Sequence, residues 1–191
     1  MPMPLAILLL AFMLVLGYLV VSPLARRDVR AYAPTPDGRR EPPPEGLYLD
    51  TVTVDARDET AWRYLDLATG IIGVPPDTTG WDLAFRRFHV ITSGAALDLG
   101  ATGFDDVRLL PDTGYVVTTM ADDTVNPALH HWYRYSFVSH LLEPGGRTFG
   151  LRTEDNQYAK LEFLSYYCPG TVPGCITLRY AYQGAGGNAF E

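Results

Sequence analysis

The sequence has few of the residues from which metal centres and active sites are built. It contains two cysteines, four histidines and, beside fourteen arginines, a single lysine. It also lacks a glycine-rich phosphate loop, a nucleophile elbow, an HExxH metal-binding motif and a CxxCH haem-attachment motif. We therefore predict that the protein is not an enzyme and holds no metal ion through a cluster of side chains.

Acidic side chains outnumber basic ones, and the formal net charge is −7 at pH 7. Residues 1–30 contribute three arginines and one aspartate, a net +2, so the rest of the chain carries −9. A domain of that charge is repelled by the phosphates of nucleic acids and by anionic lipid headgroups. We expect no nucleic-acid partner.

The longest hydrophobic run extends from Leu5 to Leu24 and contains no charged residue. Twenty helical residues span roughly 30 Å, the thickness of the hydrocarbon core of a bilayer. The first four residues carry no basic side chain, and Pro23 blocks the best signal-cleavage position, after Ser22. We predict a retained transmembrane anchor over residues 1–27, and a cleaved signal peptide is the alternative.

The predicted anchor carries side chains suited to packing against other helices. Ala11 and Gly17 are small enough for another helix to approach closely, while Phe12 and Tyr18 could fill a groove between helices. The sequence therefore predicts contacts with membrane lipid and with other membrane subunits.

Residues 28–46 are rich in proline and glycine, which favours an extended linker that holds the following domain away from the membrane. From residue 47 to residue 191 the chain alternates short apolar and polar positions between turn residues, which predicts one all-β, antiparallel domain. The expected strands cover residues 47–56, 61–70, 81–94, 114–121, 131–143, 147–153, 158–167 and 176–183. Residues 94–114 are expected to form a long loop, and residues 184–191 a loose tail.

The two cysteines, Cys168 and Cys175, flank the sequence Pro-Gly-Thr-Val-Pro-Gly. No further ligand lies between them, so a metal site is disfavoured. A disulfide that closes a turn between two strands is the simplest interpretation, and it implies an oxidising compartment. Two reduced, buried thiols are the alternative on spacing alone.

Three segments together resemble the HmuY-like family of bacterial haem-binding proteins. They are TGWDLAFRRFHVITSGA (79–95), TEDNQYAKLEFLSYY (153–167) and GCITLRYAYQ (174–183). The resemblance implies a single exported all-β domain that captures haem through two axial side chains, commonly histidines. The chain departs from the family in having a membrane anchor, and in having no histidine between residues 90 and 129.

Histidines are the candidate haem ligands, because neutral imidazole binds iron through a free ring nitrogen. His130 and His131 precede an aromatic-rich segment in which Trp132 and Tyr133 could pack on a porphyrin face, and His89 is a third candidate. An ordinary surface histidine pair is the alternative interpretation. Arg86 and Arg87 are candidate partners for the haem propionates.

The predicted orientation of the anchor involves a conflict. Arg26, Arg27 and Arg30 follow the span, and the positive-inside rule would place the β domain in the cytoplasm. The cysteine pair and the family resemblance favour the opposite side. We predict a single-pass protein of the bacterial inner membrane with its C-terminal domain in the periplasm.

Two functions follow from these features. The first is a non-catalytic accessory subunit of a larger membrane complex of respiratory or photosynthetic type, in which the anchor and the β domain contact other subunits and no cofactor is expected. The alternative is a membrane-tethered protein of haem binding or uptake, with haem as its cofactor.

Overall fold

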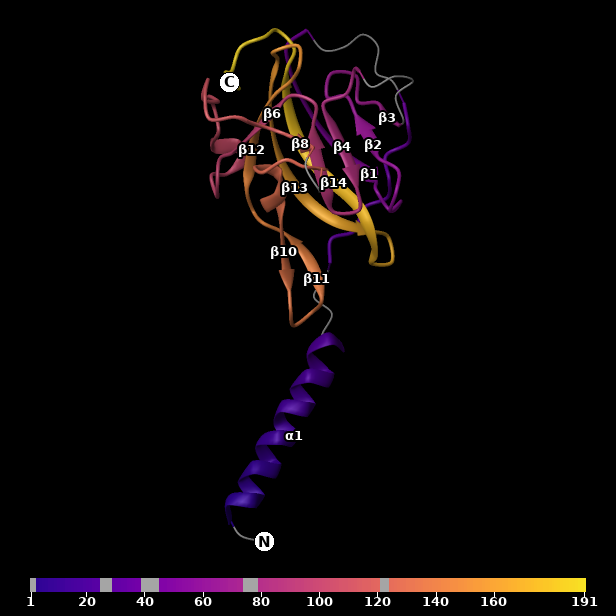
Figure 1. Cartoon of the computed structure of the whole chain (residues 1–191), viewed down its shortest axis with the longest axis vertical. Coiled ribbons are helices and arrows are strands. Elements are labelled where there is room, and N and C mark those ends of the chain that lie inside the picture. Colours follow the sequence, from indigo (N-terminus) through magenta and orange to yellow (C-terminus); the bar gives the residue numbers. More distant parts are fainter. Residues whose placement is uncertain (1–2, 25–28, 39–44, 74–78, 121–123) are drawn as a thin grey trace.

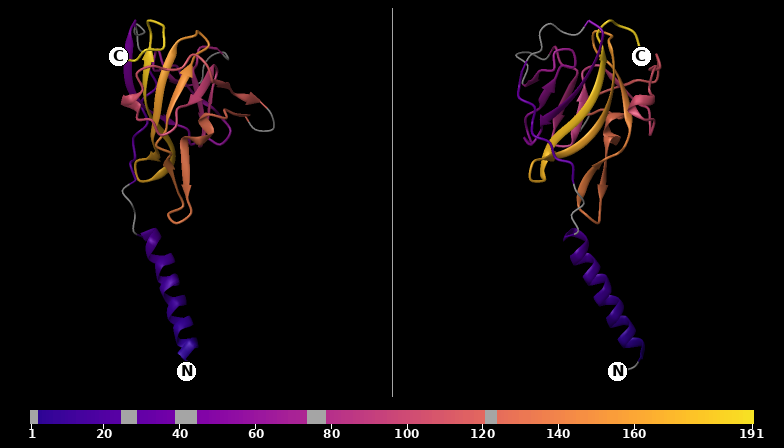
Figure 2. Two further views of the ribbon diagram at one scale, coloured as in Figure 1. Left: turned by 90° about the vertical axis from the view of Figure 1, so that its left-hand side faces the viewer. Right: turned by 180° about the vertical axis from the view of Figure 1, so that it is seen from behind.

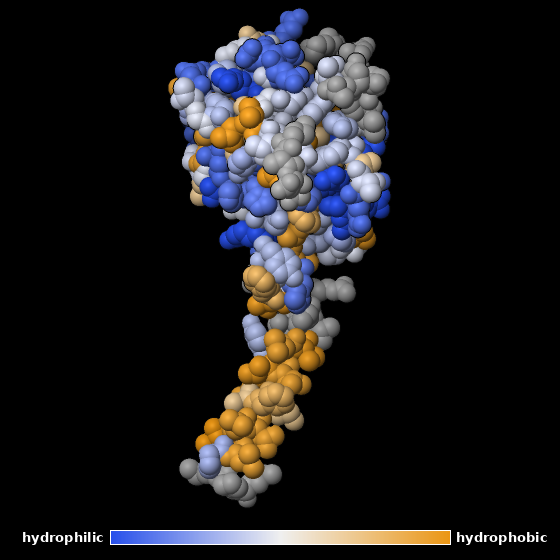
Figure 3. Space-filling model, in the orientation of Figure 1, coloured by the Kyte–Doolittle hydropathy of each residue, from blue (hydrophilic) through white to orange (hydrophobic). Residues whose placement is uncertain are grey.

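A computed structural model describes residues 3–24, 29–38, 45–73, 79–120 and 124–191 of the chain. It consists of one N-terminal helix, α1 (Met3–Leu24), followed by a β-rich domain (Figure 1). Residues 4–21 of α1 are long and apolar enough to cross a membrane, and none of them is buried by the rest of the chain. Figure 3 shows that α1 is apolar on its visible face, whereas the visible face of the β domain is mostly polar.

A six-stranded antiparallel sheet forms the larger layer of the β domain. Its order is β1-β14-β13-β12-β6-β7, so the two longest strands, β13 and β14, lie at its centre. These strands are β1 (Leu47–Asp55), β6 (Ala95–Asp98), β7 (Val116–Val117), β12 (Thr148–Arg152), β13 (Tyr158–Cys168) and β14 (Val172–Gln183).

A four-stranded antiparallel sheet of order β3-β2-β4-β5 packs against the larger one (Figures 1 and 2). Two short ribbons, β8–β9 and β10–β11, and two 3₁₀ turns, η1 and η2, complete the described part. The bounds are β2 (Arg63–Leu65), β3 (Ile72–Gly73), β4 (Leu83–Arg86), β5 (His89–Thr92), β8 (Thr119–Met120), β9 (Thr124–Val125), β10 (Tyr133–Ser136), β11 (Leu141–Pro144), η1 (Phe104–Asp106) and η2 (Leu129–Trp132).

The main core lies between the two sheets. Alternate residues of β14 enter it, as the period of two requires, and they are Ile176, Leu178, Tyr180 and Tyr182. The smaller sheet contributes Leu65, Leu83 and Phe85, which are fully buried. The predicted all-β, antiparallel fold is thereby confirmed.

The outer face of the large sheet is covered by segments that the sequence predicts to be irregular. Residues 94–114 contain the sheet strand β6 and the turn η1, and the C-terminal tail bonds to this segment. The Phe190 N–H donates to the carbonyl of Arg108 at 2.8 Å, and Phe190 is buried beside Phe104 and Leu110. The expectation of a loose tail is therefore wrong, because the aromatic ring of Phe190 finds an apolar site on the sheet.

Two predicted single strands are in fact hairpins. Residues 81–94 fold into β4 and β5, joined through Arg87 at φ 53°, and residues 131–143 fold into η2, β10 and β11, joined through His140 at φ 55°. Each turn places a residue other than glycine in the left-handed region, which is uncommon and carries little sequence signal. The alternation of apolar and polar residues continues through a tight hairpin, so it does not reveal where the chain reverses its direction.

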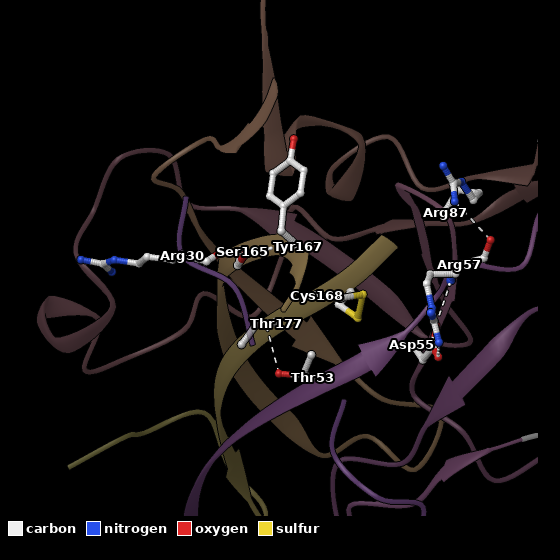
Figure 4. Close-up of a disulfide and its surroundings, with 10 residues drawn as sticks. Arg30, Thr53, Asp55, Arg57, Arg87, Ser165, Tyr167, Cys168 and Thr177 are labelled. Atoms are coloured by element: carbon white, nitrogen blue, oxygen red, sulfur yellow. Dashed lines mark hydrogen bonds and ion pairs between the residues drawn. A yellow bond between two sulfur atoms is a disulfide. The ribbon is translucent and has the colours of Figure 1, made fainter. Parts of the chain in front are cut away.

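Residues 29–38, which belong to the predicted linker, lie against the β domain. The Tyr32 N–H donates to the carbonyl of Tyr167 at 2.9 Å, and the Thr35 N–H donates to the carbonyl of Thr53 at 2.9 Å. The hydroxyl of Ser165 bonds to the carbonyl of Arg30, and Figure 4 shows these two residues side by side. We call residues 29–38 the strap.

Candidate functional site

The turn η2 presents two histidines to solvent. The buried Asn126 side chain starts this turn, because its Oδ1 accepts the N–H groups of Ala128 at 3.0 Å and Leu129 at 3.2 Å. The side chains of Leu129 and Trp132, three residues apart, point into the core, as the 3₁₀ period predicts. His130 and His131 lie between them and are exposed, with ring centroids 5.7 Å apart.

A surface pocket of about 360 Å³ opens beside these histidines. It is lined by His130, His131, Tyr133, Arg134, Gly145 and Arg147. This volume lies within the range of small-molecule sites, which is about 300–1,000 Å³. We call it the histidine pocket, and it combines imidazoles, an aromatic ring and two guanidinium groups.

Gly145 allows the chain after β11 to pass close to η2. Its N–H donates to the carbonyl of Trp132 at 2.7 Å, and a Cβ at this position would lie 3.0 Å from the carbonyl oxygen of His131. This close approach brings Arg147 to the pocket edge. Arg147 forms an ion pair with Asp98 at 2.8 Å, and that carboxylate raises the pKa of the Arg147 guanidinium.

Tyr133 forms the aromatic wall of the histidine pocket. Burial raises the pKa of its hydroxyl, and its ring contacts the rings of Phe88 and Trp132 edge-on at 5.5 and 5.2 Å. Trp132 itself is 1% exposed and donates from its indole nitrogen to the carbonyl of Phe88 at 2.8 Å. Trp132 is therefore part of the core and cannot pack on a ligand, contrary to the sequence-based expectation.

His89, at the start of β5, faces His130 across a second and much smaller pocket. His89 and His130 both line it, together with Phe88, Val90, Thr124 and Val125, and its volume of about 10 Å³ has room for one water molecule. The ring of His89 lies 4.5 Å from that of Phe88. The structure therefore brings all three candidate histidines to one region, with His130 between the two pockets.

Arg86 and Arg87 do not line the histidine pocket. The guanidinium of Arg86 lies over the ring of Trp62 at 4.6 Å, and that of Arg87 donates to the carbonyl of Arg57 at 3.2 Å (Figure 4). Their place is taken by Arg134 and Arg147, which are not among the predicted propionate partners. Neither arginine lies in a motif, and only the path of the chain through Gly145 brings them together.

The other predicted residues lie elsewhere. Cys168 and Cys175 form a disulfide with their Cα atoms 4.9 Å apart, which confirms the predicted bond. In α1 the side chains of Phe12 and Tyr18 are exposed, and no atom of the described chain lies near the position that a Cβ of Gly17 would occupy. Ala11 is exposed as well, so the described chain leaves this helix face open, and its packing against other helices stays a prediction.

The motifs that carry the family resemblance are structural in this chain. In the Trp-Asp box, the carboxylate of Asp82 accepts the Leu67 N–H at 2.8 Å and so joins β4 to the turn after β2. In the Tyr-Ala-Lys box, the buried Lys160 donates from its amine to the carbonyls of Phe104 at 2.8 Å and Val107 at 2.6 Å. The two boxes hold sheets and loops together and do not line the histidine pocket.

Solved structures from several bacteria share the fold. A candidate HmuY-like haem-binding protein of Bacteroides vulgatus is 23% identical, with a TM-score of 0.58, and the match covers 69% of this chain and 90% of that one. The apo form of an HmuY analogue from Tannerella forsythia is 20% identical, with a TM-score of 0.58 and coverages of 75% and 99%. Apo PinO from Porphyromonas gingivitis is 15% identical, with a TM-score of 0.60 and coverages of 71% and 97%.

No curated protein matches the sequence. A family model described as HmuY protein matches residues 58–180, a segment that extends from the loop before β2 to the middle of β14 and includes the histidine pocket. Because this segment makes up more than half of the sequence, the chain belongs to the HmuY family.

Proposed function

We propose that the protein is a membrane-tethered haem-binding protein and that it holds haem in the histidine pocket. The observation that carries this proposal is the joint presence of two imidazoles and two guanidinium groups in one open pocket of about 360 Å³. Imidazole is a ligand of haem iron, and guanidinium groups pair with carboxylates such as the haem propionates. The donor set therefore matches the two chemically distinct parts of haem.

Each lining residue has a separate role in the proposed site. His130 or His131 supplies an axial imidazole, and Tyr133 offers the edge of an aromatic ring to the porphyrin. Arg134 is exposed and Arg147 is half-buried, so both are placed where the propionates of a ligand would meet water. Arg147 would share its charge between the ligand and Asp98, with which it is already paired.

The family and its structural relatives support this function more than the role of accessory subunit in a respiratory or photosynthetic complex. One relative of the same fold is described as haem-binding and HmuY-like. No feature of the described residues identifies a partner subunit. The contacts of α1 with other subunits remain a prediction from its apolar surface alone.

The proposed location is the bacterial inner membrane, with the β domain in the periplasm. A retained α1 would provide the tether, since its 18-residue apolar window is long enough to span the hydrocarbon core. The disulfide supports an oxidising compartment, because such bonds are rare in the cytosol. Binding, without chemistry on the ligand, is the activity that we propose.

Titration of haemin into the full-length protein in detergent tests the haem proposal. We expect a Soret band shifted from that of free haemin, and a loss of affinity of about tenfold or more in the His130→Ala/His131→Ala double variant, equivalent to about 1.4 kcal/mol or more. His140→Ala is the matched control, because His140 is an exposed histidine on the β10–β11 turn and does not line the pocket.

Equal affinity and equal spectra for the double variant and the parent would exclude the histidine pair as the iron ligand. In that case His89→Ala distinguishes the smaller pocket from the absence of any histidine ligand. A parent protein that leaves the haemin spectrum unchanged would overturn the proposed function as a whole.

A further inference from the structure

The β10–β11 hairpin projects from the β domain with an apolar tip. Phe137 is 83% exposed, Val138 is 51% exposed and Tyr135 is 45% exposed. Figures 1 and 2 show this hairpin extending from the end of the domain at which α1 lies. An exposed cluster of large apolar side chains on a projecting element is typical of a contact surface.

The tip is held in a defined conformation. The His140 N–H donates to the carbonyl of Ser136 at 2.8 Å, and the Tyr135 hydroxyl bonds to Nδ1 of His140 at 2.7 Å. The rings of Tyr135 and Phe137 pack edge-to-face with centroids 5.1 Å apart. The apolar side chains are therefore presented outward by a structured turn, and no rearrangement is needed to expose them.

Strand β11 of the hairpin lies next to the point where the chain arrives from α1. Val29, the first residue described after the helix, lines one surface pocket together with Leu141 and Leu142 of β11. The Leu142 N–H also donates to the hydroxyl of Tyr167, at 2.8 Å, which ties the hairpin to β13. The strap and the hairpin thus share one anchoring region on the domain.

The length of chain between α1 and this region limits how far the hairpin can be from a membrane. Leu24 ends α1 and Val29 lines a pocket with β11, so five residue steps separate the helix from the hairpin, or at most about 18 Å of extended chain. Leu141 pairs with Ser136 directly before the turn at residues 137–140, so the pocket that Val29 shares with β11 reaches the end of the hairpin that carries the tip. The tip can therefore reach the bilayer surface while the strap remains bound to the domain.

We propose that the tip of the β10–β11 hairpin, Phe137 and Val138 with Tyr135 behind them, inserts into the interface of the bilayer that α1 spans. The partner is the zone of phospholipid headgroups and upper acyl chains, in which aromatic side chains are favoured. Anionic lipid headgroups do not attract the acidic domain. The burial of apolar side chains therefore stabilises the contact with the bilayer. This inference rests on the retained anchor of the proposed function and not on haem binding.

The consequence is an oriented domain. Two attachments, α1 and the hairpin tip, would stop the β domain from rotating freely about its tether. The histidine pocket includes Tyr133 and Arg134 of β10, so its direction relative to the membrane would be set by the same hairpin.

Fluorescence in phosphatidylcholine nanodiscs tests the contact with the full chain. The Phe137→Cys variant is labelled with a nitrobenzoxadiazole fluorophore, which reacts selectively because both native cysteines are paired. Leu109→Cys is the matched control, since Leu109 is 65% exposed and pairs with Ala189 beside the C-terminus, at the end of the domain away from α1. Lipid that carries a doxyl quencher on its acyl chain reports contact with the bilayer.

We expect the label at position 137 to shift to shorter wavelength and to lose most of its emission to the lipid-borne quencher, while the label at position 109 does neither. A Val138→Cys variant repeats the measurement and protects against a local effect of the Phe137 substitution. Weak quenching at all three positions in protein that has entered nanodiscs would overturn the inference. A blue shift without lipid quenching would overturn it in favour of a protein partner or a second copy of the chain.

Protein that fails to enter nanodiscs would refute the retained anchor, and the inference with it. The haemin titration is read separately, so failure of the haem site leaves this result unaffected.

Discussion

Asp82 is a carboxylate that the fold places in an unfavourable electrostatic position. Burial, together with the smaller effect of the negative charges of Asp66, Asp155 and Glu154, raises its pKa to about 7 against the opposing hydrogen bond from Leu67. The Thr92 hydroxyl and the Ser93 N–H both donate to its backbone carbonyl, so the residue cannot easily turn toward solvent. Asp82 therefore makes the stability of the domain depend on pH.

We predict that the free energy of unfolding falls as the pH rises from about 4 to about 7, in part because of Asp82. In the unfolded chain the carboxyl ionises near its ordinary pKa of 3.8, whereas in the folded domain it keeps its proton up to about pH 7. The folded state thus binds the extra proton between these values, and stability declines through this window. Chemical denaturation of the parent and of Asp82→Asn at pH 5 and pH 8 measures the effect.

The Asp82→Asn variant, which mimics the protonated carboxyl, should lose less stability between these pH values by about 1–3 kcal/mol. Asp105→Asn is the control, because Asp105 is exposed and pairs with Arg179 at 3.3 Å. The same pH dependence in the parent and in Asp82→Asn would show that Asp82 is ionised in the folded domain.

Individual residues also show what could not be predicted about this site from the sequence. Lys160 is the only lysine, and its place in a motif draws attention to it, yet the structure uses it to bind two backbone carbonyls of the η1 segment. The Trp-Asp and Tyr-Ala-Lys boxes therefore identify the fold. The residues that line the histidine pocket have no motif, apart from the adjacent histidines.

At the level of elements, the sequence predicts strands well where the core requires alternation. Ile176 to Tyr182 on β14 and the strands β12 and β13 lie as predicted. The sequence does not predict the turns at Arg87 and His140, which contain no glycine or proline. The chain reverses there because of hydrogen bonds that depend on the neighbouring strands. The sequence also fails to predict β6, whose small residues pair with β12 without any β-branched pattern.

The histidine pair was identifiable because two adjacent imidazoles precede an aromatic segment. The pairing of these histidines with Arg134 and Arg147 was not, since the two arginines are thirteen positions apart and most of the β10–β11 hairpin lies between them. The proximity of Arg86 and Arg87 to His89 in the sequence pointed instead to the turn of the β4–β5 hairpin, where Arg86 pairs in register with His89. Contacts between elements, and not local pattern, determine which cations reach the pocket.

The disulfide is a local brace on the β13–β14 hairpin. It closes a loop in which Cys168 pairs in register with Val172, while Cys175 lies opposite Asp55 of β1. We predict that the Cys168→Ser/Cys175→Ser variant folds but loses roughly 2–3 kcal/mol of stability, since so short a loop restricts the unfolded chain only moderately. Urea denaturation measures the loss, and mass spectrometry of the alkylated, unreduced parent checks that no thiol is free. A parent with two reactive thiols would contradict both the bond and the proposed compartment.

At the level of the whole molecule, the strap, residues 29–38, belongs to the β domain although it lies close to the helix in the sequence. Besides its backbone bonds to Tyr167 and Thr53, it pairs Asp37 with Arg63 at 2.7 Å and packs Val29 on the core. We predict that a chain that begins at Val29 is as stable as the full-length protein. A chain that begins at Gly46 should lose about 1–3 kcal/mol, the contribution of a few hydrogen bonds after the entropy of ordering the segment.

Thermal denaturation of the two shortened chains side by side checks this prediction. Equal melting temperatures would mean that the strap is held only loosely. A chain beginning at Val29 that is much less stable than the full-length protein would mean that α1 supports the domain, which the exposed surface of α1 argues against.

The strap also gives the molecule a mechanical property. A pull on α1 is transmitted first to the bonds of Arg30 with Ser165, of Tyr32 with Tyr167 and of Thr35 with Thr53, and not to the bonds between the sheet strands. If these bonds break, the eighteen residues from Val29 to Gly46 provide up to about 60 Å of extended chain while both sheets stay intact. A domain pulled by its helix should therefore extend in a small first step, before the disulfide-braced sheet gives way at higher force.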